Sequence, residues 1–290
     1  MSDSPFIPPQ IELQYRQIDF DCPLTFTQIW LANDPLESHF LNWFSVNTDI
    51  AEGYGMRAMR GILPQLKNAQ LLANAKCLIK QEGSHRRLHH KLNEALTTWG
   101  YARIPLMIKK QYDEFFPLLE PGRDLKVALR AACLLENLSA YALRRFLIRL
   151  EKDYKNIDPM MAYLFGYHAA EELEHKSVCF DCYTEVYGCM PTEEPKHASE
   201  WRLFNEKLME NLTESLLYFM MIDQLKRGEK VERDKEKLRK QIFGTNGIFP
   251  RESDYESYGK LGFHPCHIDD LPFVQRWDND WAPYFRQVLS

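Results

Sequence analysis

The chain has 290 residues, with 36 basic and 41 acidic side chains, and therefore a net charge of −5. This mild acidity, with no basic cluster beyond a sign-alternating stretch at 226–240, argues against binding to nucleic acid. No apolar run approaches the roughly 18 residues that a membrane span needs, and the N-terminus lacks the features of a signal peptide. We therefore expect a cytoplasmic protein with no transmembrane segment, whose seven unevenly spaced cysteines are reduced thiols.

The N-terminal region is predicted to be an extended arm. Prolines punctuate it at Pro5, Pro8, Pro9, Pro23 and Pro35. We expect little helix before residues 25–31, then helices at 36–44 and 48–63. Gly53 and Gly55 weaken the second of these helices, since each glycine costs about 1 kcal/mol in a helix interior.

Longer helices follow, marked by apolar residues at helical spacing. The predicted ranges are 68–99, 124–153, 159–188 and 197–227, and a charged stretch at 231–242 extends or follows the last of them. Asp158 and Pro159 form a strong start signal, an N-cap acceptor with proline at the first helical position. Residues 101–122 are predicted to be a connector, and the chain from residue 243 onward an irregular tail.

These lengths predict the fold class. A helix of about thirty residues spans roughly 45 Å, the length of a ferritin-like bundle helix. We therefore predict an all-α fold, a ferritin-like four-helix bundle with additional helices and irregular N- and C-terminal arms. One domain is expected over residues 1–290, with the arm and short helices at 1–47, the bundle at 48–228 and a tail packing on the bundle at 229–290.

One run carries the strongest chemical signal, His-Ala-Ala-Glu-Glu-Leu-Glu-His at residues 168–175. A helix advances about 100° per residue, so His168, Glu172 and His175 fall within roughly 60° on one face. Burying two imidazoles and a carboxylate together is costly without a positive partner, and a metal ion is such a partner. The Glu-x-x-His spacing of Glu172 and His175 is the one by which ferritin-like bundles hold two metal ions, and such bundles need it twice.

A second copy of that spacing is present at Glu82 and His85. Such a bundle also needs one carboxylate from each of the other two helices. On the early helix we choose Glu52 over Asp49, because the other carboxylates of the site are glutamates. The alternative for Glu52 is a solvated helix residue.

Glu136 is the predicted carboxylate of the remaining helix. It is the only acidic residue in the interior of the range 124–153, within an apolar stretch, and therefore needs a partner. The alternative to a metal is a buried salt bridge with an arginine such as Arg130 or Arg144.

Four neighbouring side chains receive other predictions. His89 shares the helix face of the preceding Glu-x-x-His pair, and we expect it to support a ligand or enter the substrate cavity, or to be an eighth ligand. His90 points away and should be solvated. Glu174 is expected at the surface. Glu171 would take the place of Glu172 as a metal ligand if the helix register differs.

Weaker metal patterns are also present. Cys179 and Cys182 follow His175 at a spacing that suggests zinc, but structural zinc sites usually place cysteine pairs on turns, so buried thiols are the preferred interpretation. The histidines and cysteine at 264–267 are interpreted as structural. The sequence contains no nucleophile elbow, zincin helix, His-Asp dipeptide or phosphate-binding glycine loop.

With these residues in view, the sequence resembles the family described as predicted metal-dependent hydrolases. The resemblance is carried by Tyr167 to Asp181, by Gln81 to His85 with His89, by Glu52 ahead of Ile62 to Leu66, and by Asp19-Phe20, Asp34-Pro35 and Gly262 to Pro265. Members are similar in ligand pattern to non-haem di-iron oxygenases of the ferritin-like superfamily, including the p-aminobenzoate N-oxygenase group. The resemblance implies seven ligands, Glu52, Glu82, His85, Glu136, His168, Glu172 and His175. Family members usually place histidine after the third-helix glutamate, where this chain has Asn137.

Carboxylate and imidazole ligands without thiolate favour iron or manganese. With two iron ions, the expected function is activation of O2 to oxidise a small, apolar organic substrate. Aromatic residues near the ligands, such as Tyr141, Phe165 and Tyr167, would suit an apolar pocket, although aromatic residues at helical spacing are more often part of the core. Electrons are expected from a separate donor, a reductase or ferredoxin, and a homodimer is compatible with the sequence.

Three alternatives stay open on the sequence. The first is a two-metal hydrolase that attacks an ester, amide or phosphoester. The second is a non-catalytic metal-binding bundle, which predicts no pocket beside the metals. The third is a metal-free bundle whose histidines and glutamates pair with each other.

Overall fold

The computed structural model describes residues 13–16, 18, 26–115, 124–249 and 254–289. Regular structure in these ranges is helical, apart from one isolated bridge between Leu31 and Ile157. The predicted all-α fold class is therefore confirmed. No helix of the described ranges combines the length and the apolar character needed to cross a bilayer.

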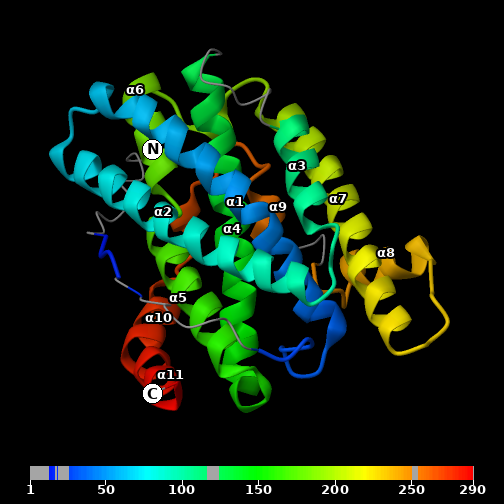
Figure 1. Cartoon of the computed structure of the whole chain (residues 1–290). Coiled ribbons are helices and arrows are strands. Elements are labelled where there is room, and N and C mark those ends of the chain that lie inside the picture. Colours follow the sequence, from blue (N-terminus) through cyan, green and yellow to red (C-terminus); the bar gives the residue numbers. More distant parts are fainter. Residues whose placement is uncertain (1–12, 17, 19–25, 116–123, 250–253, 290) are drawn as a thin grey trace.

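Four rods of helix form the centre of the molecule (Figure 1). They are α1 (Pro35–Ile62), α2 (Ala69–Thr98), α4 (Leu125–Asp153), and the consecutive pair α5 (Pro159–His175) and α6 (Val178–Tyr187). Helix α1 packs on α2 and α4, α4 packs on α5 and α6, and α2 contacts α5 and α6. On the outside, α3 (Ile104–Phe115) covers α1 and α2, and α7 (His197–Lys226) covers α1.

Side-chain caps start the four rods. Asp34, Asn68, Asp124 and Asp158 each accept hydrogen bonds from backbone N–H groups of the first turn. These N–H groups have no partner inside the helix, so a cap defines where the helix begins. The start predicted at Asp158 and Pro159 is confirmed, and the start of each rod sets which side chains face the centre.

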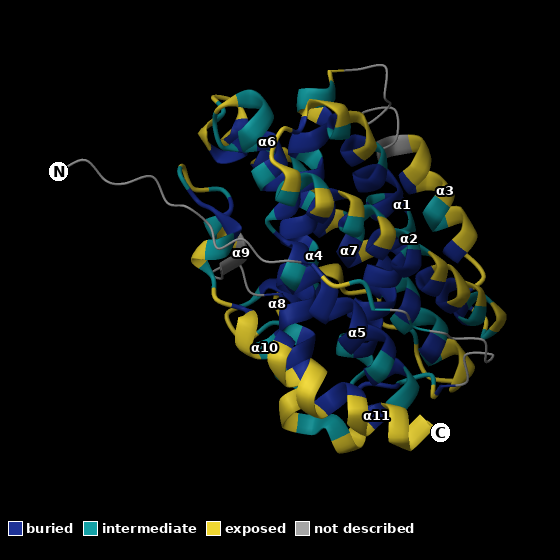
Figure 2. Cartoon of the chain, turned by 90° about the vertical axis from the view of Figure 1, so that its left-hand side faces the viewer, coloured by how far each residue is buried: buried dark blue, intermediate teal, exposed yellow. Residues whose placement is uncertain are grey.

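Buried residues fill the space between the rods, and exposed residues lie on the outer faces (Figure 2). The buried apolar side chains form one cluster, which extends from Leu13 in the arm to Phe285 near the C-terminus. Ionisable side chains interrupt this cluster where α1, α2, α4 and α5 meet. Burying ionisable side chains is costly unless they have partners, so this region is the candidate functional site.

Helix α1 is continuous, whereas the sequence predicted two helices at 36–44 and 48–63. Val46 lies in the predicted gap and is completely buried. Gly53 allows close packing, because a Cβ there would stand 3.2 Å from the guanidinium carbon of Arg86. Packing on α2 therefore outweighs the low helix propensity of glycine.

The helix predicted at 159–188 is in fact two helices, with a break at Lys176 and Ser177. At the break, the Lys176 ammonium donates hydrogen bonds to the Ile268 carbonyl and the Asp270 carboxylate. We attribute the break to this contact with a segment about ninety residues away, because a basic residue mid-helix gives no local signal for it.

Residues 26–31 are extended rather than helical, and the first residue of the predicted range 25–31 lies outside the described part. The Trp30 carbonyl accepts a hydrogen bond of 2.9 Å from the Asp158 backbone N–H. Pairing with the connection between α4 and α5 thus replaces the predicted local helix.

The connector predicted at 101–122 contains α3, and its residues 116–122 lie outside the described part. Pro105 stands in the first helical turn, where proline is tolerated because its missing N–H would have no partner anyway. Ile104 is buried while Leu106 is exposed, as an amphipathic helix requires.

The charged stretch predicted at 231–242 forms a separate helix, α8 (Lys235–Phe243), which follows α7. The tail beyond it, predicted to be irregular, also contains helices, which corrects that prediction. They are α9 (Asp254–Ser257), α10 (Leu271–Arg276), a π-helical turn (Trp277–Trp281) and α11 (Ala282–Leu289). Trp277, Trp281 and Phe285 recur every four residues and are buried. This helical spacing is the signal that the prediction missed, and through it α10 and α11 pack on α5.

Candidate metal centre

Seven ionisable side chains predicted from the sequence meet at the centre of the rods. The first group comprises Glu52, His85, His168 and Glu172, and the second group Glu82, Glu136, Glu172 and His175. Within each group, one ligand atom of every residue lies within 4.8 Å of the others. Helix α1 supplies one carboxylate, α2 and α5 supply the paired motifs, and α4 supplies one carboxylate. The side chains therefore converge, while metal binding by them stays a prediction.

In the first group, two imidazoles face two carboxylates. Nε2 of His168 lies 3.2 Å from Oε1 of Glu52 and 2.9 Å from Oε1 of Glu172. Nδ1 of His85 lies 3.6 Å from the same oxygen of Glu52 and 3.8 Å from that of Glu172. These atoms surround a space that can hold one cation.

In the second group, one imidazole faces three carboxylates. Nε2 of His175 lies 3.1 Å from Oε1 of Glu82, 3.3 Å from Oε2 of Glu136 and 3.1 Å from Oε2 of Glu172. Glu172 thus turns one oxygen to each group. Such a carboxylate is placed to bridge two cations.

Burial and missing hydrogen bonds show that the two groups fit cations. Each of the seven residues is at most 7% exposed. Both oxygens of Glu52 and of Glu82 lack a hydrogen-bond donor among the described residues, as do one oxygen each of Glu136 and Glu172. Buried carboxylates without a positive partner are costly, and two divalent ions would balance the charge of these four.

Without metal, the neighbouring carboxylates shift one another's pKa values. Burial and the neighbouring charges of Glu82 and Glu172 raise the pKa of Glu52 well above its ordinary value. Burial and Glu82 likewise raise the pKa of Glu136 to about 8. Although burial acts to raise it, the pKa of Glu172 is lowered by His175 and His168.

The pKa values of the imidazoles are also shifted in opposite directions. Burial lowers the pKa of His168 to about 4. For His85, burial acts to lower the pKa, but the hydrogen bond to Glu171 and the nearby Glu82 carboxylate raise it to about 9. Protons on such groups compete with a cation, so metal binding would release them.

Arg130 and Arg144, the alternative partners for Glu136, pair with other carboxylates. Arg130 donates a hydrogen bond of 2.6 Å to Glu200, and Arg144 binds the buried Asp270 carboxylate. Glu136 instead faces His175 in the second group.

The choice of Glu52 over Asp49 agrees with the geometry. Glu52 is buried, so it is not the solvated residue of the alternative interpretation. Asp49 lies outside both groups and pairs with Arg86 at 2.7 Å, with its side chain 21% exposed.

His89 lies behind His168 rather than inside either group. Its Nε2 is 2.8 Å from Nδ1 of His168, whose other nitrogen faces the first group. His89 can therefore fix the orientation of the His168 ring, as partners of metal-binding histidines do. His90 is exposed, as predicted, beside Glu94.

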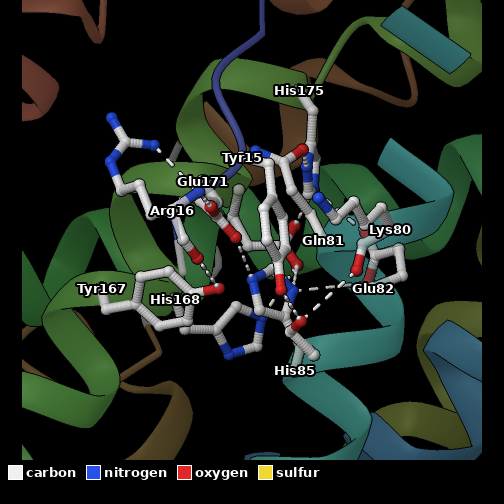
Figure 3. Close-up of polar contacts among 12 residues, drawn as sticks. Tyr15, Arg16, Lys80, Gln81, Glu82, His85, Tyr167, His168, Glu171 and His175 are labelled. Carbon is white, nitrogen blue, oxygen red and sulfur yellow. Dashed lines mark hydrogen bonds and ion pairs between the residues drawn. The ribbon is translucent and has the colours of Figure 1, made fainter. Parts of the chain in front are cut away.

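Glu171 supports His85 and does not replace Glu172 (Figure 3). Nε2 of His85 lies 2.9 Å from Oε2 of the fully buried Glu171. The other oxygen of Glu171 accepts a hydrogen bond of 2.9 Å from the backbone N–H of Arg16. Nδ1 of His85 is thereby left to face the first group.

Glu174 is not at the surface as predicted, because the N-terminal arm covers it. The Arg16 guanidinium donates two hydrogen bonds of 2.7 Å to the Glu174 carboxylate, whose side chain is 11% exposed. The same guanidinium reaches Asp278 near the C-terminus. One arginine thus joins both ends of the described chain to α5.

Gln81 supports His175 in a similar way. Its Oε1 lies 3.1 Å from Nδ1 of His175, and its Nε2 donates to the Gln14 carbonyl at 3.1 Å. Gln81 was missed as a functional residue, although its position four residues before His85 places it on the same helix face. The sequence gives no comparable signal for Arg16, which stands alone in the arm.

Replacing Glu171 with alanine is expected to weaken metal binding about 10–100-fold, the usual effect of removing the partner of a metal-binding histidine. Titration of metal-free protein with Fe(II) or Mn(II) measures the change. Glu174→Ala is the matched control, since Glu174 contacts Arg16 but not His85. Equal losses in the two variants would mean that the arm, and not the orientation of His85, matters.

The cysteine and tail histidine patterns form no further site. Neither Cys179 nor Cys182 belongs to a metal-binding group of the described residues, and Cys179 Sγ lies 3.7 Å from Oε1 of Glu136. Burial raises the pKa of both thiols. His264 contacts Asp181 at 3.1 Å and so ties the tail to α6, as expected for a structural residue.

A cavity of about 510 Å³ lies beside the centre, between α1, α4 and α7. Its walls are mainly apolar, with Trp43, Phe44, Leu134, Leu138, Phe204 and Leu208 among them. Ala51 and Leu135, the chain neighbours of Glu52 and Glu136, also line it. Tyr141, Phe165 and Tyr167 do not line this cavity and are buried in the core, which is the alternative that the sequence left open for them.

Comparison with known proteins gives one result that agrees with this centre. A family model described as "Predicted metal-dependent hydrolase" matches residues 14–269, most of the chain. No curated protein and no solved structure matches the sequence.

Proposed function

The chain belongs to the family of predicted metal-dependent hydrolases, and from this premise we propose that its buried centre holds two iron ions and activates O2 to oxidise a small apolar substrate. The observation that carries the proposal is the pair of buried donor groups joined by Glu172 beside an apolar cavity. Carboxylate and imidazole donors without thiolate suit iron or manganese.

The residues have distinct tasks in this proposal. Glu52, His85 and His168 would hold one ion, Glu82, Glu136 and His175 the other, and Glu172 both. When bound as Fe(II), the metals would supply the electrons that reduce O2. The protein fixes the donor geometry and keeps water from the reacting atoms, because the donors are buried and the adjoining cavity is apolar.

His85, His168 and His175 each have a buried partner that leaves the opposite ring nitrogen facing a donor group. These partners would hold the three rings in the orientation that a metal ion needs. Repeated turnover would need an external electron donor, and we propose a separate reductase or ferredoxin.

A two-metal hydrolase is the second candidate, and the family description favours it. In that reaction the metals would activate water toward an ester, amide or phosphoester. The apolar cavity argues for the oxidative reaction, since a hydrolase benefits from polar groups that hold and protonate the leaving group.

The test compares the two reactions in one preparation. Metal-free protein is loaded with about two Fe(II) per chain without oxygen, then mixed with O2 while the ultraviolet absorption of Fe(III) and the O2 concentration are recorded. The proposal predicts rapid O2 uptake and a ferric band, both lost in Glu82→Ala. Absence of O2 uptake, with O2-independent cleavage of esters by zinc- or manganese-loaded protein, would instead establish the hydrolase.

A further inference from the structure

The apolar cavity contains polar side chains, and two of them are already satisfied by the protein. The Asn47 amide donates to the Trp43 carbonyl at 2.7 Å, and the Thr48 hydroxyl donates to the Phe44 carbonyl at 2.9 Å. Both bonds run along α1, and neither group needs a ligand.

Gln111 of α3 differs from them. It lines the same cavity and is 3% exposed, yet its Nε2 has no hydrogen-bond acceptor among the described residues. A buried amide N–H without an acceptor is unfavourable, and such a group calls for a partner such as a water, an ion or a ligand. Because Gln111 lines the cavity, a molecule bound there can supply the acceptor.

We propose that Gln111 selects the substrate, and that the substrate is a neutral, mainly apolar molecule carrying one carbonyl- or amide-type acceptor for the Gln111 Nε2. This inference rests on the proposed function only in taking the cavity as the substrate site. The cavity volume lies within the range of about 300–1,000 Å³ that holds small organic ligands.

Charge in and around the cavity argues against an ionised acceptor. A carboxylate buried against a neutral amide loses its hydration without gaining a counter-ion. The charged residues that line the cavity are Asp124, Glu200 and Lys207, two acids and one base. They provide no net attraction for an anion, whereas the smaller desolvation cost of one neutral carbonyl is offset by a hydrogen bond from Gln111.

The proposal is tested by binding, using three probes with one apolar body. Benzylacetone carries a neutral acceptor, butylbenzene carries none, and phenylbutyrate carries an ionised one. Affinities are measured by calorimetry on the full chain, loaded with Mn(II) so that no turnover is needed. The ratio of benzylacetone to butylbenzene affinity should be on the order of tenfold higher in wild-type protein than in Gln111→Leu, the usual value of one hydrogen bond, and wild-type protein should bind phenylbutyrate most weakly.

Two variants locate the effect. Gln111→Leu should weaken the binding of benzylacetone relative to butylbenzene while keeping affinity for butylbenzene. Ala131→Trp, which adds bulk to a cavity-lining position, should weaken the binding of all three probes. Circular dichroism and melting curves show whether each variant is folded.

Three results would overturn the proposal: an unchanged preference in Gln111→Leu, tightest binding of phenylbutyrate, or no binding of any probe by wild-type protein. Unchanged binding in folded Ala131→Trp would also overturn it, since the probes would then bind elsewhere. None of these measurements involves O2. If the probes behave as expected and the oxygen test fails, the reaction assignment alone is wrong.

Discussion

Replacing Glu172 with alanine is expected to reduce metal content from about two ions per chain to well below one. The reason is that Glu172 belongs to both groups, with Oε1 toward His168 and Oε2 toward His175. Its loss leaves each ion with one donor fewer and removes the bridge between them. Metal analysis of protein purified without chelators, after reconstitution with Fe(II), measures the content.

A graded comparison makes this result specific. Glu52→Ala removes a donor from the first group alone, so about one ion should remain. Glu94→Ala is the control, because that carboxylate lies on α2 with its side chain 69% exposed. Equal metal content in Glu172→Ala, Glu94→Ala and the wild type would refute the assignment of the bridge.

Gly166→Ala is expected to destabilise the protein strongly, by about 1–3 kcal/mol or more, as overpacking of a core does. A Cβ at Gly166 would lie 2.1 Å from Cζ3 and 2.6 Å from Cη2 of Trp277, a ring that is 1% exposed. Neither α5 nor the ring can move without disturbing the core. Urea denaturation gives the change in the free energy of unfolding.

The control is Gly83→Ala, at a helical glycine whose Cβ would have no neighbour closer than 3.9 Å. That change should stabilise the protein by about 1 kcal/mol through helix propensity. In a Trp277→Ala background, Gly166→Ala should become nearly neutral. Additive losses in the double variant would show that the ring is not the cause.

Local patterns predicted which side chains converge, because helix geometry fixes the face on which each of them lies. The spacings of His168, Glu172 and His175, and of Glu82 and His85, place each set on one face of a helix without knowledge of the fold. Glu136 stood out because a lone carboxylate in an apolar stretch needs a partner. The cap at Asp158 likewise depends on a few adjacent residues.

Features that depend on distant contacts could not be read from the sequence. The break after His175 coincides with the contact between Lys176 and Asp270, and the burial of Glu174 follows from Arg16. The orientation of His85 depends on Glu171, whose role is visible only once α2 and α5 are packed together. The helical spacing of Trp277, Trp281 and Phe285 was present in the sequence but was outweighed by the glycines and prolines around it.

The most direct test is an anomalous difference map from crystals grown with Fe(II) or Mn(II). The account predicts two peaks, one among Glu52, His85 and His168 and the other among Glu82, Glu136 and His175, with Glu172 between them. Crystals of folded, metal-exposed protein with no peak at either group, or with metal bound only elsewhere, would contradict it.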